Sequence, residues 1–433
     1  MKSIHKQRHF IFMLVLIVLA FSMIQLTANA NQENAATAGK ETVVWQNFLS
    51  AEKAFAPVID EMIGLYESAN EGVEIEVVEL PYEQTLQQTI ISATAGSMAD
   101  VVLLVPQWVP PLVELNSLEP LENYFTKTEF ADIPKAAYES GVVKGQTYCV
   151  PALLNVVMVW AWKPLLEQAG LPLEIPGTWE EFKTASKAIS SLGTDIYGFA
   201  ARTNNTGNSA YWMFPIIWGH GGQFEDSSGK IVLDEGNGYA ESLTWYNELV
   251  STGQSPNAQG VRELRNIFAQ GQTGFLLDVS TAIGTFRSVS ERGTEIDKDI
   301  VAGLIPMAED GKRYGIGNDN VYAVSAGSKV KESASSFIKF MTQDPVATKI
   351  FYQKSGAFPT YKALFNDPDY KAAPFFSEIA VMADFGTSNP SKNPNFGAAL
   401  DVMANAMQEA ILGGDVTQIV DNTASRVKEI YGQ

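Results

Sequence analysis

Histidine and cysteine are nearly absent from this 433-residue chain, which contains three histidines and one cysteine. His5 and His9 lie in the first ten residues, so His220 and Cys149 stand alone in the remainder. A histidine or cysteine metal cluster cannot be built from one of each, and a Ser-His-Asp triad would have to use His220. His220 lies in WGHGG, where a helix cap is the simpler interpretation. We expect no metal site, no cofactor and no disulfide, with Cys149 buried in a strand.

Motifs for nucleotide and calcium binding are also missing. The segment GIGNDN is not a GxGxxG fingerprint, no GKT or GKS loop occurs, and no DxDxDG pattern is present. Glycosidase chemistry by paired carboxylates stays open, because 49 acidic residues always provide candidate pairs. No other feature of the sequence favours it.

Basic residues are scarce relative to acidic ones, at 30 against 49. Without the three basic residues of the amino-terminal segment, Lys2, Lys6 and Arg8, the formal net charge changes from −19 to −22. Such a surface disfavours nucleic acid and anionic lipid as partners.

The amino terminus has the pattern of a secretory signal peptide. Its basic residues precede twelve apolar residues, 10–21, and Ala28-Asn29-Ala30 offers a cleavage site of small residues. A membrane anchor needs about 20 apolar residues. We therefore expect residues 1–30 to be removed after Ala30, which leaves a periplasmic protein that is not anchored to the membrane.

Strands and helices alternate over residues 42–105. Strands are predicted at 42–48, 73–80 and 100–105, and helices at about 54–68 and 82–95. This order predicts a parallel sheet with helices on both faces and with ligands near the carboxyl ends of the strands. Five side chains at the first and third strand ends should face the crevice, namely Gln46, Asn47, Phe48, Gln107 and Trp108.

The segment GQTYCVPALLNVVMVWAWKP, residues 145–164, contains 17 uncharged residues from Gln146 to Trp162. This run is too short and too interrupted to span a membrane. A proline within a buried run is typical of a strand that leaves a sheet, because proline cannot donate to an interior ladder. We interpret the region near Pro151 as a crossover between two lobes, with further crossovers at Pro306 and at KSGAFPTY, residues 354–361.

Aromatic and amide side chains are concentrated near predicted strand ends and loops. Sugars present C–H faces that stack on aromatic rings and hydroxyl groups that need hydrogen bonds, so this combination favours a carbohydrate ligand. Each aromatic residue taken alone is more often a core residue. The large aromatics of interest are Trp45, Trp108, Trp160, Trp162, Tyr211, Trp212, Trp218 and Tyr322.

Four segments follow one another along the chain in a distinctive order: GQTYCVPALLNVVMVWAWKPLLEQAGL, PGTWEEFKTASKAI, GQTGFLLDVSTAIG and KSGAFPTY. Together they resemble the carbohydrate-type extracellular solute-binding proteins of ABC importers, a family to which maltose-binding protein belongs. The resemblance implies a type II periplasmic-binding-protein fold: two α/β lobes, each a mostly parallel sheet flanked by helices, joined by a multi-crossover hinge. We place the N-terminal lobe at 41–152 plus 305–356 and the C-terminal lobe at 153–304 plus 357–433.

The same resemblance implies where a sugar would be held. Tyr211 matches an aromatic that stacks on sugar, Asn155 a ligand-facing residue beyond the first crossover, and residues 278–281 a turn near the ligand. The tryptophan common in that turn is absent here, and Ala161 and Trp162 replace a common Tyr-Asn pair. The implied ligand-binding residues are Gln46, Asn47, Gln107, Trp108, Asn155, Tyr211, Trp218, Asp278, Ser280, Asn318, Asp319, Asn320 and Tyr322.

These features predict a monomeric, non-catalytic component of a sugar importer, which captures a mono- or oligosaccharide by hinge closure and presents it to the membrane permease subunits. One alternative keeps the fold but binds a polyol phosphate, a peptide or another solute. An anionic ligand of that kind would need a basic residue, with Arg202 and Arg287 as candidates. A second alternative is a secreted polysaccharide-degrading enzyme.

Overall fold

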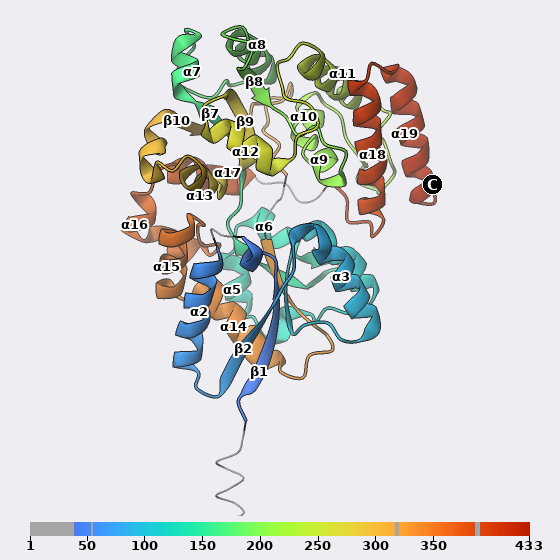
Figure 1. Cartoon of the computed structure of the whole chain (residues 1–433). Helices are drawn as coiled ribbons and strands as arrows, with labels where there is room; N and C mark the ends of the chain where they lie inside the picture. Colours follow the sequence, from blue (N-terminus) through green and yellow to red (C-terminus); the bar gives the residue numbers. More distant parts are fainter. Residues whose placement is uncertain (1–38, 53–54, 317–319, 386–389) are drawn as a thin grey trace, which may run out of the picture.

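The protein consists of two lobes, each built around its own β-sheet (Figure 1). A computed structural model describes residues 39–433 except 53–54, 317–319 and 386–389. The predicted signal peptide and the site candidates Asn318 and Asp319 lie outside the described residues. Within the described residues, no helix is both long enough and apolar enough to cross a bilayer.

The first lobe contains a five-stranded sheet in the order β2-β1-β3-β11-β6. β1 pairs in parallel with β2 and β3, while β11 runs antiparallel to β3 and β6. The carboxyl ends of β1, β2 and β3 therefore meet at one edge, where β11 begins. The strands are β1 (Glu41–Asn47), β2 (Val73–Glu79), β3 (Val101–Leu104), β6 (Cys149–Leu153) and β11 (Asn320–Val324), beside a small pair, β4 (Val142–Val143) and β5 (Gln146–Thr147).

Helices cover both faces of this sheet and close an apolar core. Trp45 lies at the centre with its ring 5.1 Å from that of Phe337 in α14. The helices of this lobe are α2 (Ala56–Ala69), α3 (Tyr82–Ala95), α4 (Val109–Glu114), α5 (Lys127–Asp132), α6 (Lys135–Ser140), α14 (Lys331–Gln343) and α15 (Pro345–Ser355), with 3-10 turns η1 (Leu49–Ala51), η2 (Pro106–Trp108) and η3 (Leu121–Asn123). The last two helices come from late in the sequence, so the chain returns to the first lobe.

The second lobe contains a four-stranded sheet in the order β10-β7-β9-β8, with strands β7 (Val157–Trp162), β8 (Tyr197–Ala200), β9 (Thr273–Val279) and β10 (Ile300–Gly303). Only β8 and β9 pair in parallel, so this sheet is mixed rather than mostly parallel. Two neighbouring parallel strands must be joined by a crossover connection, usually a helix. β7 instead enters directly from the first lobe, and it runs antiparallel to both of its neighbours, β9 and β10.

The second core is rich in aromatic residues, such as Phe182 and Phe275, whose rings lie 4.6 Å apart. Its helices are α7 (Lys163–Gln168), α8 (Trp179–Ser190), α9 (Gly207–Tyr211), α10 (Phe214–Gly219), α11 (Gly238–Ser251), α12 (Val261–Ala269), α13 (Ala282–Val289), α16 (Pro368–Lys371), α17 (Phe376–Phe385), α18 (Phe396–Ile411) and α19 (Val416–Ile430), with 3-10 turns η4 (Gly293–Asp299) and η5 (Lys362–Asn366). α8 begins at the predicted capping box, where Thr178 Oγ1 accepts from Glu181 N and Glu181 Oε2 accepts from Thr178 N.

The first crossover lies at residues 154–156, between β6 and β7. The predicted position near Pro151 is three residues too early: Pro151 lies within β6, opposite Val321. β6 is an edge strand, so the missing N–H of proline leaves no interior ladder bond unmade. A second crossover runs alongside, since Leu154 N donates to Phe358 O at 3.0 Å. Cys149 is buried in β6, as predicted.

Candidate functional site

Three aromatic rings lie at the carboxyl ends of the three parallel strands of the first lobe. Phe48 follows β1, Tyr82 follows β2 at the start of α3, and Trp108 follows β3. Their ring centroids are 5.1 to 6.2 Å apart, which is contact distance for aromatic pairs. We call Phe48, Tyr82 and Trp108 the aromatic row. Trp108 was predicted as a contact; Tyr82 was missed, although its position directly after a strand was the available signal.

Two amide side chains at the same edge have buried polar atoms that lack a partner. Asn47 Oδ1 accepts from Leu49 N at 2.8 Å, but its Nδ2 has no hydrogen-bond partner among the described residues. The same is true of Gln107 Oε1. Leaving a buried polar group unsatisfied costs about 1–3 kcal/mol, so a ligand that supplies an acceptor and a donor here would gain that free energy.

Gln46 has a different role from its neighbour, because side chains alternate along a strand. Its Nε2 donates to Thr89 Oγ1 in α3 at 2.6 Å, and Gln46 is buried. The structure therefore places Gln46 between sheet and helix as a brace, while Asn47 lies on the opposite side of β1.

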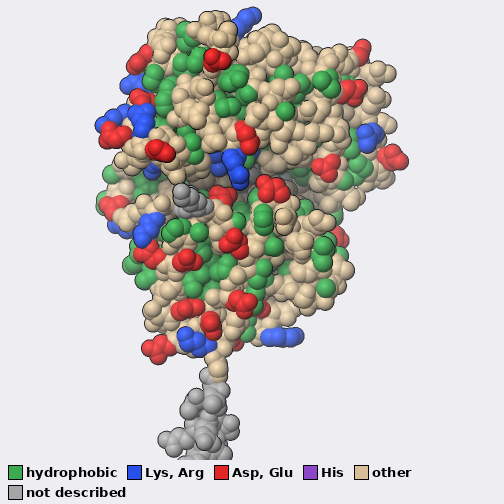
Figure 2. Space-filling model, viewed as in Figure 1, with side chains coloured by type: hydrophobic (Ala, Val, Ile, Leu, Met, Phe, Trp, Pro, Cys, Tyr) green, Lys and Arg blue, Asp and Glu red, His purple; other side chains and the backbone are tan. Residues whose placement is uncertain are grey.

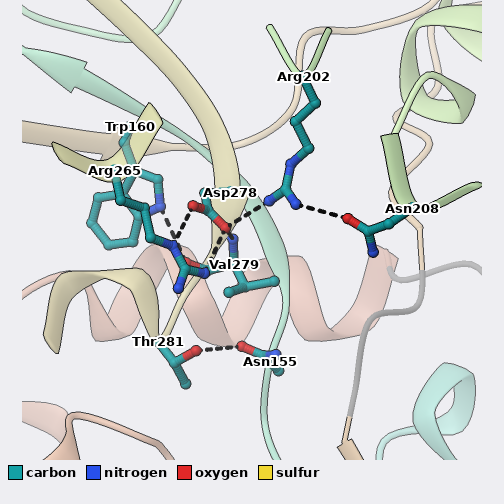
Figure 3. A network of polar contacts seen from close by, with 8 residues as sticks. All are labelled: Asn155, Trp160, Arg202, Asn208, Arg265, Asp278, Val279 and Thr281. Carbon is teal, nitrogen blue, oxygen red and sulfur yellow. Dashed lines mark hydrogen bonds and ion pairs between the residues drawn. The ribbon is translucent and has the colours of Figure 1, made fainter. Parts of the chain in front are cut away.

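A buried charged cluster lies at the equivalent edge of the second lobe (Figure 3). Asp278 is near the end of β9, Arg202 follows the neighbouring parallel strand β8, and Arg265 reaches in from α12. Arg265 holds Asp278 with two hydrogen bonds, Nε to Oδ2 at 2.8 Å and Nη2 to Oδ1 at 3.0 Å. Arg202 Nη2 adds a third at 3.1 Å. We call Arg202, Asp278 and Arg265 the arginine–aspartate cluster.

The carboxylate of Asp278 accepts four hydrogen bonds within the protein, three at Oδ1 and one at Oδ2. Its fourth hydrogen bond comes from Val279 N at 2.8 Å. Burial alone would raise the pKa of Asp278, but Arg265 and Arg202 outweigh it and hold that pKa below its ordinary value. The structure thus gives this predicted contact residue the task of fixing two arginines.

Arg202 is held from three sides. Its guanidinium stacks 3.7 Å from the ring centroid of Trp212, its Nη1 donates to Asn208 Oδ1 at 3.1 Å, and its Nη2 donates to Asp278. Its Nε has no partner among the described residues. Burial lowers the pKa of Arg202 to about 10, while Asp278 acts in the opposite direction.

The aromatic row and the arginine–aspartate cluster face each other between the lobes. Burial raises the pKa of Tyr82 to about 12, and Arg202 and Asn208 of the other lobe lie near enough to act against that rise. Figure 2 shows basic and acidic side chains meeting along the furrow between the lobes. The candidate site is therefore composite, with rings and amides on one wall and guanidinium groups on the other.

Two predicted contact residues hold the hinge. Asn155 Oδ1 accepts from Thr281 Oγ1 at 2.7 Å, a bond that joins the first crossover to the turn after β9 (Figure 3). Ser280 Oγ donates to Leu154 O at 3.1 Å and Ser280 N donates to Val156 O at 2.8 Å. These bonds attach the crossover to the second lobe.

The remaining predicted residues occupy several positions. Tyr322 lies in the first core, 6.0 Å from Trp45 between ring centroids, so the structure does not bring it to the furrow. Asn320 is buried where β11 begins, at the edge where β3 ends. In the second lobe, Tyr211 is fully buried with ring contacts to Phe214 and Phe396, and Trp218 packs on Phe214 and Tyr314.

Outside the furrow, a pocket of about 400 Å³ opens at the opposite edge of the first sheet. Its main acidic group, Asp100, is already bonded within the protein, to Ser328 Oγ at 2.6 Å and Val44 N at 2.9 Å. In the described part of the chain, no three His, Cys, Asp or Glu side chains lie where they could hold a metal ion.

Comparison with known proteins gives the family. A family model for bacterial extracellular solute-binding proteins matches residues 61–377. A putative binding protein of Brucella abortus is 23% identical over 86% of this chain and 90% of its own length. The maltotriose-binding protein of Pyrococcus abyssi is 26% identical over 88% of this chain and 79% of its own length.

The solved structures agree on the fold. The ABC transporter solute-binding protein of Thermotoga lettingae, bound to α-D-tagatose, superposes with a TM-score of 0.80 at 19% identity, over 90% of this chain and 99% of the other. This likeness confirms the predicted two-lobe fold. The match of one family model to most of the sequence shows that the chain belongs to the bacterial extracellular solute-binding proteins.

Proposed function

We propose that this protein is the solute-binding component of an ABC-type sugar importer, and that it captures a mono- or oligosaccharide between its lobes. The observation that carries the proposal is the aromatic row beside the unpartnered amide atoms of Asn47 and Gln107. A sugar fits both features, because its C–H face stacks on rings while its hydroxyl groups donate and accept hydrogen bonds. The same class of ligand is supported by a relative named a maltotriose-binding protein and by a structural neighbour bound to α-D-tagatose.

The strength of such a site follows from ordinary magnitudes. Stacking adds about 0.5–1.5 kcal/mol per ring beyond the burial of area. Satisfying a buried, unpaired amide atom recovers about 1–3 kcal/mol. Together with apolar burial, two rings and two amides are enough for a dissociation constant in the micromolar range, about −8 kcal/mol.

The mechanism we propose is closure about the hinge, a common mode in two-lobed binding proteins. The moving bodies are residues 41–152 plus 305–356 and residues 153–304 plus 357–433. The mature protein, cleaved after Ala30, acts as a monomer in the periplasm, performs no catalysis, and presents its closed form to the permease subunits.

A fluorescence screen tests this function. Trp108 and Trp212 lie on opposite walls of the site, so closure around a ligand changes their surroundings. We expect at least one mono-, oligosaccharide or polyol to change the tryptophan emission saturably and to raise the melting temperature. A folded protein that responds to no member of a broad carbohydrate panel would refute the proposal, and release of reducing ends from a polysaccharide would favour an enzyme instead.

A further inference from the structure

The arginine–aspartate cluster contains two guanidinium groups and one carboxylate, so the cluster itself has one positive charge more than it neutralises. Two guanidinium groups share one carboxylate, and the three side chains are 7% (Arg202), 19% (Arg265) and 1% (Asp278) exposed. No second carboxylate forms an ion pair with Arg202 or Arg265 among the described residues. A buried net charge is costly, so its retention in a chain with 49 acidic residues calls for an explanation.

The other basic candidate, Arg287, shows what a purely structural pair looks like here. Its Nε and Nη2 bond to the two carboxylate oxygens of Asp297 at 3.0 and 2.6 Å. One guanidinium therefore meets one carboxylate, and no charge is left over. Arg202 differs because its only carboxylate is shared with Arg265.

Arg202 also keeps an unused donor. Its Nε–H is buried and has no partner among the described residues, while Trp212, Asn208 and Asp278 fix the plane of the guanidinium. A fixed guanidinium with a free donor is preorganised for an oxyanion, since charge-assisted hydrogen bonds are about twice as strong as neutral ones. The depressed pKa of Arg202, caused chiefly by burial, agrees with a cation that lacks a full counter-charge.

The facing lobe does not provide that counter-charge to Arg202. The group of that lobe that acts on Arg202 is the neutral hydroxyl of Tyr82. Glu52 lies on the side of Arg265 and Arg262, is exposed, and forms no ion pair with either among the described residues. Glu52 lies near enough to act on Arg265, whereas the groups that act on Arg202 are Asp278, Arg265, Tyr82 and Tyr246.

We propose that Arg202 receives a carboxylate of the ligand, so that the captured sugar is an acidic one, such as a uronate or a uronate-containing oligosaccharide. The surplus charge of the cluster is +1, which one carboxylate neutralises. A phosphate monoester carries about −1.5 to −2 at neutral pH and would leave negative charge in the closed site. The aromatic row binds the sugar ring of the same molecule, so this assignment rests on the proposed sugar-binding function.

Titration calorimetry with matched pairs of sugars tests the assignment on the unmodified protein. The probes are galacturonate against galactose, glucuronate against glucose, their dimers, and the 6-phosphates of galactose and glucose. We expect the uronate of at least one pair to bind tenfold or more tighter than its neutral partner, with the preference reduced at high salt. Arg202→Met should remove the preference, Arg202→Lys should retain part of it, and Arg287→Met should leave it unchanged.

The outcomes separate this inference from the proposed function. Equal or tighter binding of the neutral sugars overturns the acidic ligand and leaves sugar binding standing. Tighter binding of the 6-phosphates overturns the carboxylate assignment. Absence of binding by every probe overturns the acidic ligand, and the broad carbohydrate panel then decides the proposed function separately. Should Arg202→Met fail to fold, as judged by circular dichroism, the comparison on the unmodified protein and the Arg202→Lys variant decide the matter.

Discussion

Replacing Asp278 with asparagine should destabilise the protein strongly, because Asp278 neutralises two buried arginines. Asparagine keeps the shape of the side chain and removes its charge, which leaves Arg202 and Arg265 beside each other with no carboxylate. Removing one partner from a buried ion pair costs about 3–5 kcal/mol. At roughly 2–4 °C per kcal/mol for a lobe of this size, the melting temperature should fall by roughly 6–20 °C.

Urea denaturation and calorimetry of Asp278→Asn measure this loss, with Asp234→Asn as the matched control. Asp234 pairs with Lys428 at 2.6 Å, but both side chains are about 30% exposed, so the control should lose less than about 1 kcal/mol. The reasoning fails if Asp278→Asn loses no more stability than the control. That result would mean that the two arginines do not depend on this carboxylate.

Three further predictions follow from the same structure. Trp108→Ala should weaken sugar binding tenfold or more in a fluorescence titration, whereas Trp108→Phe keeps a stacking ring and should lose less; equal losses would remove stacking as the cause. Gly198→Ala should lower the free energy of unfolding by about 1–3 kcal/mol, because a Cβ at this position would lie 2.0 Å from Ser186 O. The control Gly397→Ala should be neutral or slightly stabilising, because a Cβ there would meet open space. The pKa of Asp278 is lowered in the folded protein, so its contribution to the free energy of unfolding is complete above about pH 4 and is lost as the pH falls through the folded-state pKa. The stability difference between wild type and Asp278→Asn should therefore shrink below about pH 4. A difference that stays constant in acid would contradict this sign.

Local patterns in the sequence predicted the elements well. The expected helix at 82–95 is α3 with the same bounds, and the capping box at Thr178 forms as predicted. Such features depend on residues a few positions apart, so the sequence contains them directly. The first crossover was misplaced because β6 continues through Pro151 as an edge strand, with only a register shift in its pairing to β11 beside the proline.

Side-chain roles were harder to predict because they depend on distant partners. Asp278 resembles a ligand contact by its position at a strand end, but its carboxylate is bonded to Arg202, 76 residues away, and to Arg265. Tyr322 is only two residues from Asn320, which lies at the furrow edge of the first sheet, yet the ring of Tyr322 packs on Trp45 in the core. No spacing rule encodes these pairings, since they arise only when β8, β9 and α12 come together.

A crystal structure of the protein with the bound sugar tests the central claim most directly. The account predicts that the ligand lies between the lobes, with its ring against Trp108 and a polar group within hydrogen-bond distance of Arg202 Nε. Ligand bound instead to one lobe alone, for example in the pocket beside Asp100 and Ser328 at the opposite edge of the first sheet, would contradict it.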